Sequence, residues 1–170
     1  MSISIAEIKD TPQLVTIINS AYRGDESYKG WTTEAEMVAG ELRINDESMK
    51  ELMETPGTVF LKYYNEENII EGAVFLQKQN NKLYLGMLSV SPFLQTKGIG
   101  KKLMTAAEEY AKKQNCIAVF MQVISIRHEL IAWYERQGYY KTGATQPFTD
   151  GLFGTAKYPI EFIMMQKELT

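Results

Sequence analysis

The sequence predicts a mixed α/β (α+β) fold, in which a mostly antiparallel central sheet of about six to seven strands is flanked by about four to five helices. The stretch 58–90 holds three runs rich in β-branched and aromatic residues, separated by short turns that contain asparagine, as in an antiparallel meander. A strand, a helix and another strand then follow in order, which predicts a parallel, right-handed crossover. No repeat and no linker rich in Pro, Gly or Ser divides the chain, so residues 1–170 are expected to form a single domain.

The first third of the chain is expected to contain one strand and three helices. Pro12 stands where proline is favoured at a helix start, and Gly24 marks the place where that helix is expected to end. Thr32 or Thr33 can cap a second helix, and Thr33 with Glu36 has the spacing of a capping box. The expected ranges are a strand over 2–8 and helices over 12–24, 33–42 and 47–53.

The rest of the chain alternates strands and helices, with Gly138 in a position that commonly ends a helix. Residues 101–114 repeat apolar side chains at helical spacing, while 117–124 are apolar on both faces, as in a central strand. Residues 145–159 are expected to form a long loop, which either binds a ligand or is a plain excursion. The expected strands cover 58–64, 69–79, 82–90, 117–124, a stretch from 139 and 162–169, and the helices cover 101–114 and 127–136.

The composition is that of an ordinary globular protein, and it argues against several classes of function. Hydrophobic residues make up 45% of the chain and charged residues 23%, and the formal net charge of −3 argues against general nucleic-acid binding. No apolar run approaches the roughly 20 residues of a membrane helix, and the amino terminus lacks a signal-peptide pattern. A cytoplasmic protein without membrane contact is therefore expected. One cysteine, Cys116, excludes an internal disulfide, and with the single histidine, His128, it cannot assemble a typical zinc site, so no metal is expected.

The stretch 86–100, which reads GMLSVSPFLQTKGIG, is typical of an anion-binding loop. An apolar strand ends near Pro92, and a loop with Gly98 and Gly100 leads directly into an amphipathic helix. A helix start exposes about four unpaired N–H groups and the positive end of the helix dipole, and glycine lets phosphate oxygens approach the backbone. Positive side chains gather at the same place, at Lys97, Lys101 and Lys102. Cations at a helix start oppose the dipole, which favours a bound polyanion.

Two other phosphate-binding motifs do not fit this stretch. A Walker A loop requires Gly five residues before the Gly-Lys pair and Ser or Thr after it, but Gln95 and Lys102 occupy those positions. A dinucleotide-binding fingerprint requires a small residue three positions after Gly100, where Leu103 stands. It also requires an acidic residue at the end of the next strand, and none follows 117–124.

The order of residues instead resembles the acetyl-CoA loop of the GCN5-related N-acetyltransferases (GNAT). That loop follows the central strand and reads Gln or Arg, two residues, Gly, one residue and Gly or Ala, which Gln95, Gly98 and Gly100 match. A second family element, an apolar helix that ends in Tyr before a Gly and an aromatic residue, is similar to Leu130, Trp133, Tyr134, Glu135, Arg136, Gly138 and Tyr139. The run GWTTEA at 30–35 is similar to one in a bacterial subgroup of this superfamily.

The resemblance implies that acetyl-CoA binds where the strands that end near Val90 and Ile124 separate. Backbone groups of Leu88 and Val90 would pair with the pantetheine arm, and the amides of 95–101 would hold the diphosphate. The family often carries Asn where this chain has Arg127, which is therefore either a coenzyme A contact or a surface residue. The residues that the resemblance places at the cofactor are Leu88, Ser89, Val90, Gln95, Thr96, Lys97, Gly98, Ile99, Gly100, Lys101 and Arg127.

Tyr134 matches the family position that often contacts or protonates the departing thiolate, and it is the expected catalytic residue. The alternative interpretation of Tyr134 is that its aromatic ring only packs on the inner face of the helix. The resemblance implies an acetyl-CoA-dependent N-acetyltransferase that acts on a primary amine of a small molecule or peptide, by direct attack in a ternary complex. The alternative is a noncatalytic acyl-CoA-binding or regulatory module of the same fold, and a homodimer is compatible with the sequence.

The sequence singles out no general base. Glu71 is a weak candidate, His128 is expected to be a solvated residue at a helix start, and water can remove the proton instead. Cys116 is expected to be a buried small hydrophobe and not an acetyl carrier. The acceptor pocket is expected to involve Tyr22, Trp31, Glu34 and the 145–159 loop, with ordinary packing as the alternative for each.

Overall fold

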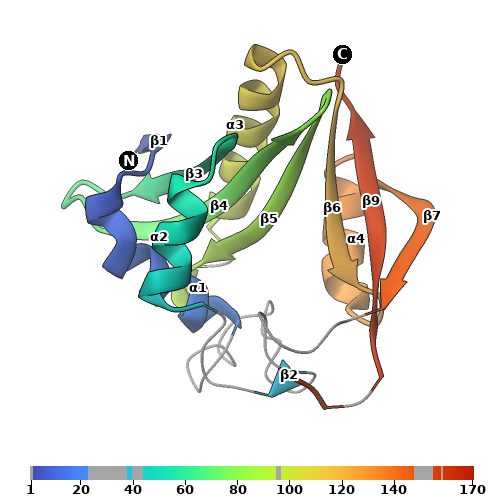
Figure 1. Ribbon diagram of the computed structural model, residues 1–170, viewed down its shortest axis with the longest axis horizontal. Helices are drawn as coiled ribbons and strands as arrows, with labels where there is room; N and C mark the ends of the chain where they lie inside the picture. Colours follow the sequence, from blue (N-terminus) through green and yellow to red (C-terminus); the bar gives the residue numbers. More distant parts are fainter. Residues whose placement is uncertain (1, 23–37, 40–43, 95–96, 148–154, 158) are drawn as a thin grey trace.

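A computed structural model of the chain describes residues 2–22, 38–39, 44–94, 97–147, 155–157 and 159–170. Seven strands form one sheet in the order β1-β3-β4-β5-β6-β9-β7, which Figure 1 shows. All neighbouring strands are antiparallel except β5 and β6, which are parallel. The expected α/β fold, its antiparallel meander and its parallel crossover are confirmed.

The bounds of most elements agree with the sequence pattern. The strands of the sheet are β1 (Ser2–Ile5), β3 (Thr58–Tyr64), β4 (Ile70–Gln79), β5 (Lys82–Val90), β6 (Ala118–Ile124), β7 (Tyr140–Pro147) and β9 (Glu161–Glu168). The helices are α1 (Thr11–Tyr22), α2 (Asp46–Glu54), α3 (Ile99–Lys113) and α4 (His128–Arg136), with 3-10 turns at Ile8–Asp10 and Pro92–Leu94. A second pair of short strands consists of β2 (Val38–Ala39) and β8 (Thr155–Ala156).

The sheet separates two apolar layers because successive side chains of a strand point to opposite faces. On β3, Phe60 packs with α1 and α2, and the next residue, Leu61, packs on the α3 and α4 side. The same alternation on β4 places Phe75 in the first layer and Val74 in the second. Both faces of the central strands are therefore covered by helices, as Figure 1 shows for α1 and α2 on one side and α3 and α4 on the other.

Gly72 in β4 lets α3 lie close to the sheet. A Cβ atom added at this glycine would lie 3.0 Å from Cγ2 of Ile99 and 3.0 Å from Cδ1 of Leu103. Real Cβ atoms rarely approach so closely, so the glycine is required by the packing of the first turn of α3. This contact fixes the position of the helix start that the sequence predicts as an anion-binding site.

The expected strand over 2–8 is too long. It ends at Ile5, and the chain then turns through the 3-10 segment Ile8–Asp10. The Asp10 carboxylate closes this turn, since it accepts hydrogen bonds from the backbone N–H of Glu7 at 2.8 Å and from the Lys62 ammonium at 2.8 Å.

Two further expectations about local structure are wrong. Val38–Ala39 does not continue a helix over 33–42, because it forms strand β2 and pairs with β8. A capping-box pattern cannot reveal a partner strand more than a hundred residues away. The other residues of the range 33–42 lie outside the described part of the chain. Residues 145–147 belong to β7 and not to a loop, and 155–156 form β8.

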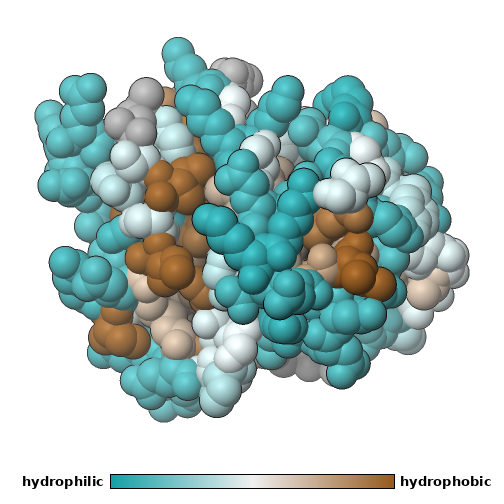
Figure 2. Space-filling model, turned by 90° about the horizontal axis from the view of Figure 1, so that it is seen from above, coloured by the Kyte–Doolittle hydropathy of each residue, from teal (hydrophilic) through white to brown (hydrophobic). Residues whose placement is uncertain are grey.

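The surface is mixed in character. Figure 2 shows that hydrophilic residues cover most of the face seen there, with hydrophobic residues gathered in separate patches. Within the described ranges, no helix has the length and apolar composition to cross a membrane.

Candidate active site

The two parallel strands at the centre of the sheet pair over a short stretch only. Their register runs from Lys82 opposite Ala118 to Tyr84 opposite Phe120. Beyond this point β5 continues to Val90 beside β4, and β6 continues beside β9. Figure 1 shows the two strands diverging, so the sheet is open between their carboxyl ends.

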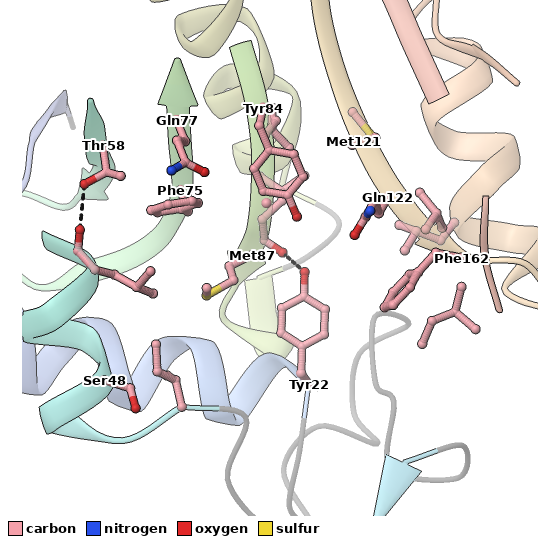
Figure 3. A pocket seen from close by; sticks show the side chains of 18 of the residues that line it. Tyr22, Ser48, Thr58, Phe75, Gln77, Tyr84, Met87, Met121, Gln122 and Phe162 are labelled. Atoms are coloured by element: carbon pink, nitrogen blue, oxygen red, sulfur yellow. Dashed lines mark hydrogen bonds between the residues drawn. The ribbon is translucent and has the colours of Figure 1, made fainter. Parts of the chain in front are cut away.

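A β-bulge in β5 lies at the edge of this opening. The register with β4 shifts between Ala73 and Phe75, so that Met87 and Leu88 together oppose one residue of β4. Met87 has a φ of 50°, in the left-handed region that non-glycine residues seldom adopt. The hydroxyl of Tyr22, the last residue of α1, donates a hydrogen bond to the Leu88 carbonyl (Figure 3). The bulge is therefore held from the α1 side by a buried side chain.

A cavity of about 490 Å³ starts at the bulge and extends along the α1 and α2 face of the sheet. Its lining also includes Leu130 and Tyr134 of α4, which pack on the other face, so the cavity continues through the opening between β5 and β6. Figure 3 shows its side chains converging from α1, α2, the central strands and β9. The polar and aromatic lining residues are Tyr22, Asn45, Ser48, Glu51, Thr55, Thr58, Phe75, Gln77, Tyr84, Gln122, Arg127, Tyr134 and Phe162.

Tyr134 lies in the wall of the cavity that α4 forms. Its side chain is 5% exposed, and its ring packs edge-on against Trp133 and Tyr139, with centroid distances of 5.3 and 6.2 Å. Burial raises the pKa of the Tyr134 phenol well above its ordinary value, the nearby Tyr22 raises it further, and the Arg127 guanidinium opposes both effects. The phenol is therefore protonated at neutral pH and available as a hydrogen-bond donor.

Arg127 lines the same wall, at the connection between β6 and α4. It is 8% exposed, so the alternative that it is a surface residue is wrong. Its backbone N–H donates to the Ile124 carbonyl at 3.0 Å, and its carbonyl accepts from the N–H of Ile131 in α4. A buried guanidinium brings a permanent positive charge to the cavity wall.

The start of α3 has the features of an anion site. Gly98 is the N-cap residue, with a φ of 80°, and in the described structure no side chain caps this helix end. Lys97 and Lys101 are exposed, whereas Ile99 is buried against the sheet. A Cβ added at Gly100 would make ordinary contact with Trp133 at 3.4 Å. Gln95 and Thr96 lie outside the described residues.

The other sequence candidates lie away from the cavity or outside the described ranges. Glu71 accepts a hydrogen bond from Asn65 at 2.7 Å and does not line the cavity, nor does the exposed His128. Cys116 is buried, and burial raises the pKa of its thiol, which fits an inert side chain. Trp31, Glu34, the GWTTEA run at 30–35 and most of the 145–159 loop are not described, and the described residues of that loop do not line the cavity. The described residues contain no group of His, Cys, Asp or Glu that could hold a metal ion.

Two groups of lining residues were not predicted. The first is a polar stripe that consists of Ser48 and Glu51, three residues apart on α2, and of Thr55, the C-cap residue after the helix. From the sequence alone, this spacing could have indicated that the residues share one face of a helix. The second is the aromatic pair Phe75 and Tyr84, which form part of the cavity lining between α2 and β6. The alternation of strand residues gives their face, but only the fold places that face in a cavity.

Comparison with known proteins agrees with this geometry. The profile of the Acetyltransferase (GNAT) family matches residues 15–139. Acetyltransferase Atu2258 of Agrobacterium fabrum (strain C58) is 29% identical over 87 residues, which cover 51% of this chain and 62% of that protein. The match therefore spans less than two thirds of the length of that curated relative.

Solved structures share the fold at low sequence identity. The crystal structure of smu.2055 from Streptococcus mutans UA159 has a TM-score of 0.76 at 18% identity, with 100% of both chains covered. A ribosomal-protein-alanine N-acetyltransferase from Brucella melitensis has a TM-score of 0.74 at 21% identity, with 99% of this chain and 100% of that chain covered. Because the family profile matches most of its length, this chain belongs to the GNAT family of acetyltransferases.

Proposed function

We propose that this protein transfers the acetyl group of acetyl-CoA to a primary amine of a small molecule or peptide, by direct attack in a ternary complex. The observation that carries the proposal is the opening between β5 and β6, with Tyr134 in the cavity wall, and with the start of α3, whose residues do not line the cavity, following the end of β5 in the chain. The family membership and the GWTTEA run support the choice of an acetyltransferase, and a bacterial subgroup and a cytoplasmic location are part of the proposal.

The backbone around the opening fits an extended, amide-bearing cofactor arm. The ladder between β5 and β6 ends at Tyr84, so the following part of β5 can accept an added strand. Leu88 and Val90 would supply backbone groups to it. The Leu88 carbonyl already accepts the Tyr22 hydroxyl, and a carbonyl has a second lone pair. Ser89 is fully buried and donates its hydroxyl to the Met87 carbonyl at 2.8 Å, so we assign it to support of the bulge.

The start of α3 fits a diphosphate. Amides near the N-cap Gly98, with those of Ile99 and Gly100, would donate to phosphate oxygens, and Lys97 and Lys101 would add positive charge. Gln95, Thr96 and the buried Arg127 complete the proposed cofactor contacts. Coenzyme A, when bound, supplies the activated thioester.

Tyr134 would stabilise the negative charge that develops on the departing sulfur. Burial raises the pKa of its phenol above the ordinary value of about 10, so this phenol gives up its proton less readily than an ordinary tyrosine does. We infer that Tyr134 acts as a strong hydrogen-bond donor to the thiolate and keeps most of its proton. Glu71 and His128 do not line the cavity, and Glu51, the carboxylate that does, belongs to α2, whereas Tyr134 belongs to α4, so we propose that water carries away the proton of the attacking amine.

Thiol release from acetyl-CoA tests the proposal across a panel of polyamines, aminoglycosides, amino acids and peptide amino termini. We expect turnover with at least one class. Tyr134→Phe should lower kcat by roughly 10-fold to 100-fold, the worth of a hydrogen bond to a charged group, and should change the acetyl-CoA affinity less. Because the phenol stays protonated, its ionisation should cause no loss of kcat up to about pH 10.

Tyr140→Phe is the matched control, since it also removes one phenolic hydroxyl, which is exposed and donates to Glu168. It should leave kcat unchanged. A wild-type kcat in Tyr134→Phe would exclude the role of this hydroxyl. Acetyl-CoA binding without turnover on any amine would favour the noncatalytic acyl-CoA-binding module instead.

A further inference from the structure

The two ends of the cavity carry opposite charges. Arg127 is the only cationic side chain among the described lining residues, and it lies beside Tyr134 at the end formed by β6 and α4. Glu51 is the only carboxylate among them, and it belongs to α2. Figure 3 shows these ends on opposite sides of the central strands, with Ser48 of α2 on one side and Gln122 of β6 on the other. A molecule that spans the cavity therefore meets a cation at one end and an anion at the other.

The α2 end is held firmly in place. Asn19 of α1 and Ile44 make two reciprocal hydrogen bonds, at 2.8 and 3.0 Å, which fix the chain just before the helix. The Asn45 side chain then caps α2 by accepting from the N–H of Ser48 at 2.8 Å. Met49 is fully buried under the helix, so the rotation of α2 about its axis is set by packing. This packing holds Ser48 and the solvent-exposed Glu51 in the lining of the cavity.

Aromatic rings lie between the two ends. The Tyr84 ring folds back over Gly86, where an added Cβ would lie only 2.9 Å from the ring atom Cε2. The Phe75 ring of the neighbouring strand β4 lies next to the Tyr84 ring. Their centroids are 6.3 Å apart, and the ring planes meet edge to face at 67°. Aromatic faces attract cations, and they also accommodate the methylene groups of an alkyl chain.

We propose that the α2 end binds a second positive charge of the acceptor, so that the preferred acceptors are primary amines with another cationic group several bonds away. This inference rests on the proposed acetyl transfer. The reacting amine must lose its proton before attack, so it cannot be the group that remains paired with Glu51. The remote cation pairs with Glu51 while the alkyl chain lies along Tyr84 and Phe75. An acceptor that carries a carboxylate at this position meets a like charge instead.

Three acceptors of similar length separate these cases, namely 1,4-diaminobutane, n-butylamine and 4-aminobutyrate. Values of kcat/KM should fall in that order for the wild-type protein. A partly exposed ion pair with some cation–π support corresponds to a preference of roughly fivefold to tenfold for the diamine over n-butylamine. Equal values for the three acceptors would overturn the inference.

Glu51→Gln tests the carboxylate, and Glu54→Gln is its control on the same helix, because both glutamates are exposed but Glu54 does not line the cavity. Glu51→Gln should reduce the preference for the diamine to within about twofold and should relieve the discrimination against 4-aminobutyrate. Glu54→Gln should keep the wild-type order. An unchanged preference in Glu51→Gln would refute the role of this carboxylate.

Calorimetric titration with 1,4-diaminobutane distinguishes failure of this inference from failure of the proposed function. Binding to the wild type that weakens in Glu51→Gln, without turnover of any acceptor, would refute acetyl transfer and leave the cation site standing. Turnover without any dependence on Glu51 would refute the cation site alone. Neither binding nor turnover would refute both.

Discussion

The hydroxyl of Tyr22 offers a direct test of how the bulge in β5 is maintained. Tyr22→Phe removes one oxygen and keeps the ring, which is 6% exposed and packs in the layer of α1 and α2. The Leu88 carbonyl would lose its donor, and leaving a buried polar group without a partner costs about 1–3 kcal/mol. For a chain of this size, each kcal/mol lowers the melting temperature by about 2–4 °C.

The same substitution should also act on the proposed reaction. Met87 holds a left-handed backbone conformation, which costs a non-glycine residue about 1–2 kcal/mol, and the Tyr22 hydrogen bond to the next residue helps to hold it. Without that bond the bulge should relax, the peptide groups around Leu88 should turn, and kcat should fall while the fold persists.

Thermal unfolding and steady-state thiol release check both effects on the same samples. Tyr140→Phe again serves as the control and should lower the free energy of unfolding by less than about 1 kcal/mol, because its hydrogen bond is exposed. If Tyr22→Phe kept both the melting temperature and the kcat of the wild type, the reasoning about the bulge would be wrong.

Two further substitutions test the seating of α3. Gly72→Ala should lower the free energy of unfolding by about 1–3 kcal/mol in urea titrations, because its Cβ would press on Ile99 and Leu103, and unchanged stability would contradict the close packing. Gly98→Ala meets no atom within 4 Å, so its strain at a φ of 80° should cost only about 1–2 kcal/mol. Its main effect should be weaker acetyl-CoA binding by calorimetry, and wild-type affinity would argue against the loop assignment.

Much of the fold could be predicted because its signals are local. The bounds of β3 and β5 agree with the sequence expectation, since β-branched and aromatic runs are separated by turn residues such as Asn80, which has a φ of 56°. The pairing of β2 with β8 could not be predicted, because Val38 meets Ala156 only through the tertiary fold. The turn at Asp10 likewise depends on Lys62, which lies 52 residues away in the sequence.

Some residues of the candidate site could also be predicted from the sequence, and others could not. Tyr134 and Arg127 were identified by their spacing within a family pattern, but the burial of Arg127 required the structure. Glu51 belongs to no family pattern, and its spacing from Ser48 indicates only that the two residues share one face of a helix. It became a candidate only when α2 packed across the cavity from β6.

The short pairing of β5 with β6 has a mechanical consequence. Among the described residues, a ladder of three residue pairs that ends at Tyr84 and Phe120, together with a hydrogen bond from the N–H of Ile117 to the Asn81 carbonyl, joins the backbones of the four strands on one side of this seam and the three on the other. The continuous apolar layer under α3 and α4 joins the two sides, with Val74 and Met121 among its members. Side-chain packing can slide by small steps, whereas a hydrogen-bonded ladder cannot. If the two half-sheets move relative to one another, we therefore expect the movement at this seam, where fewer residue pairs join neighbouring strands than anywhere else in the seven-stranded sheet.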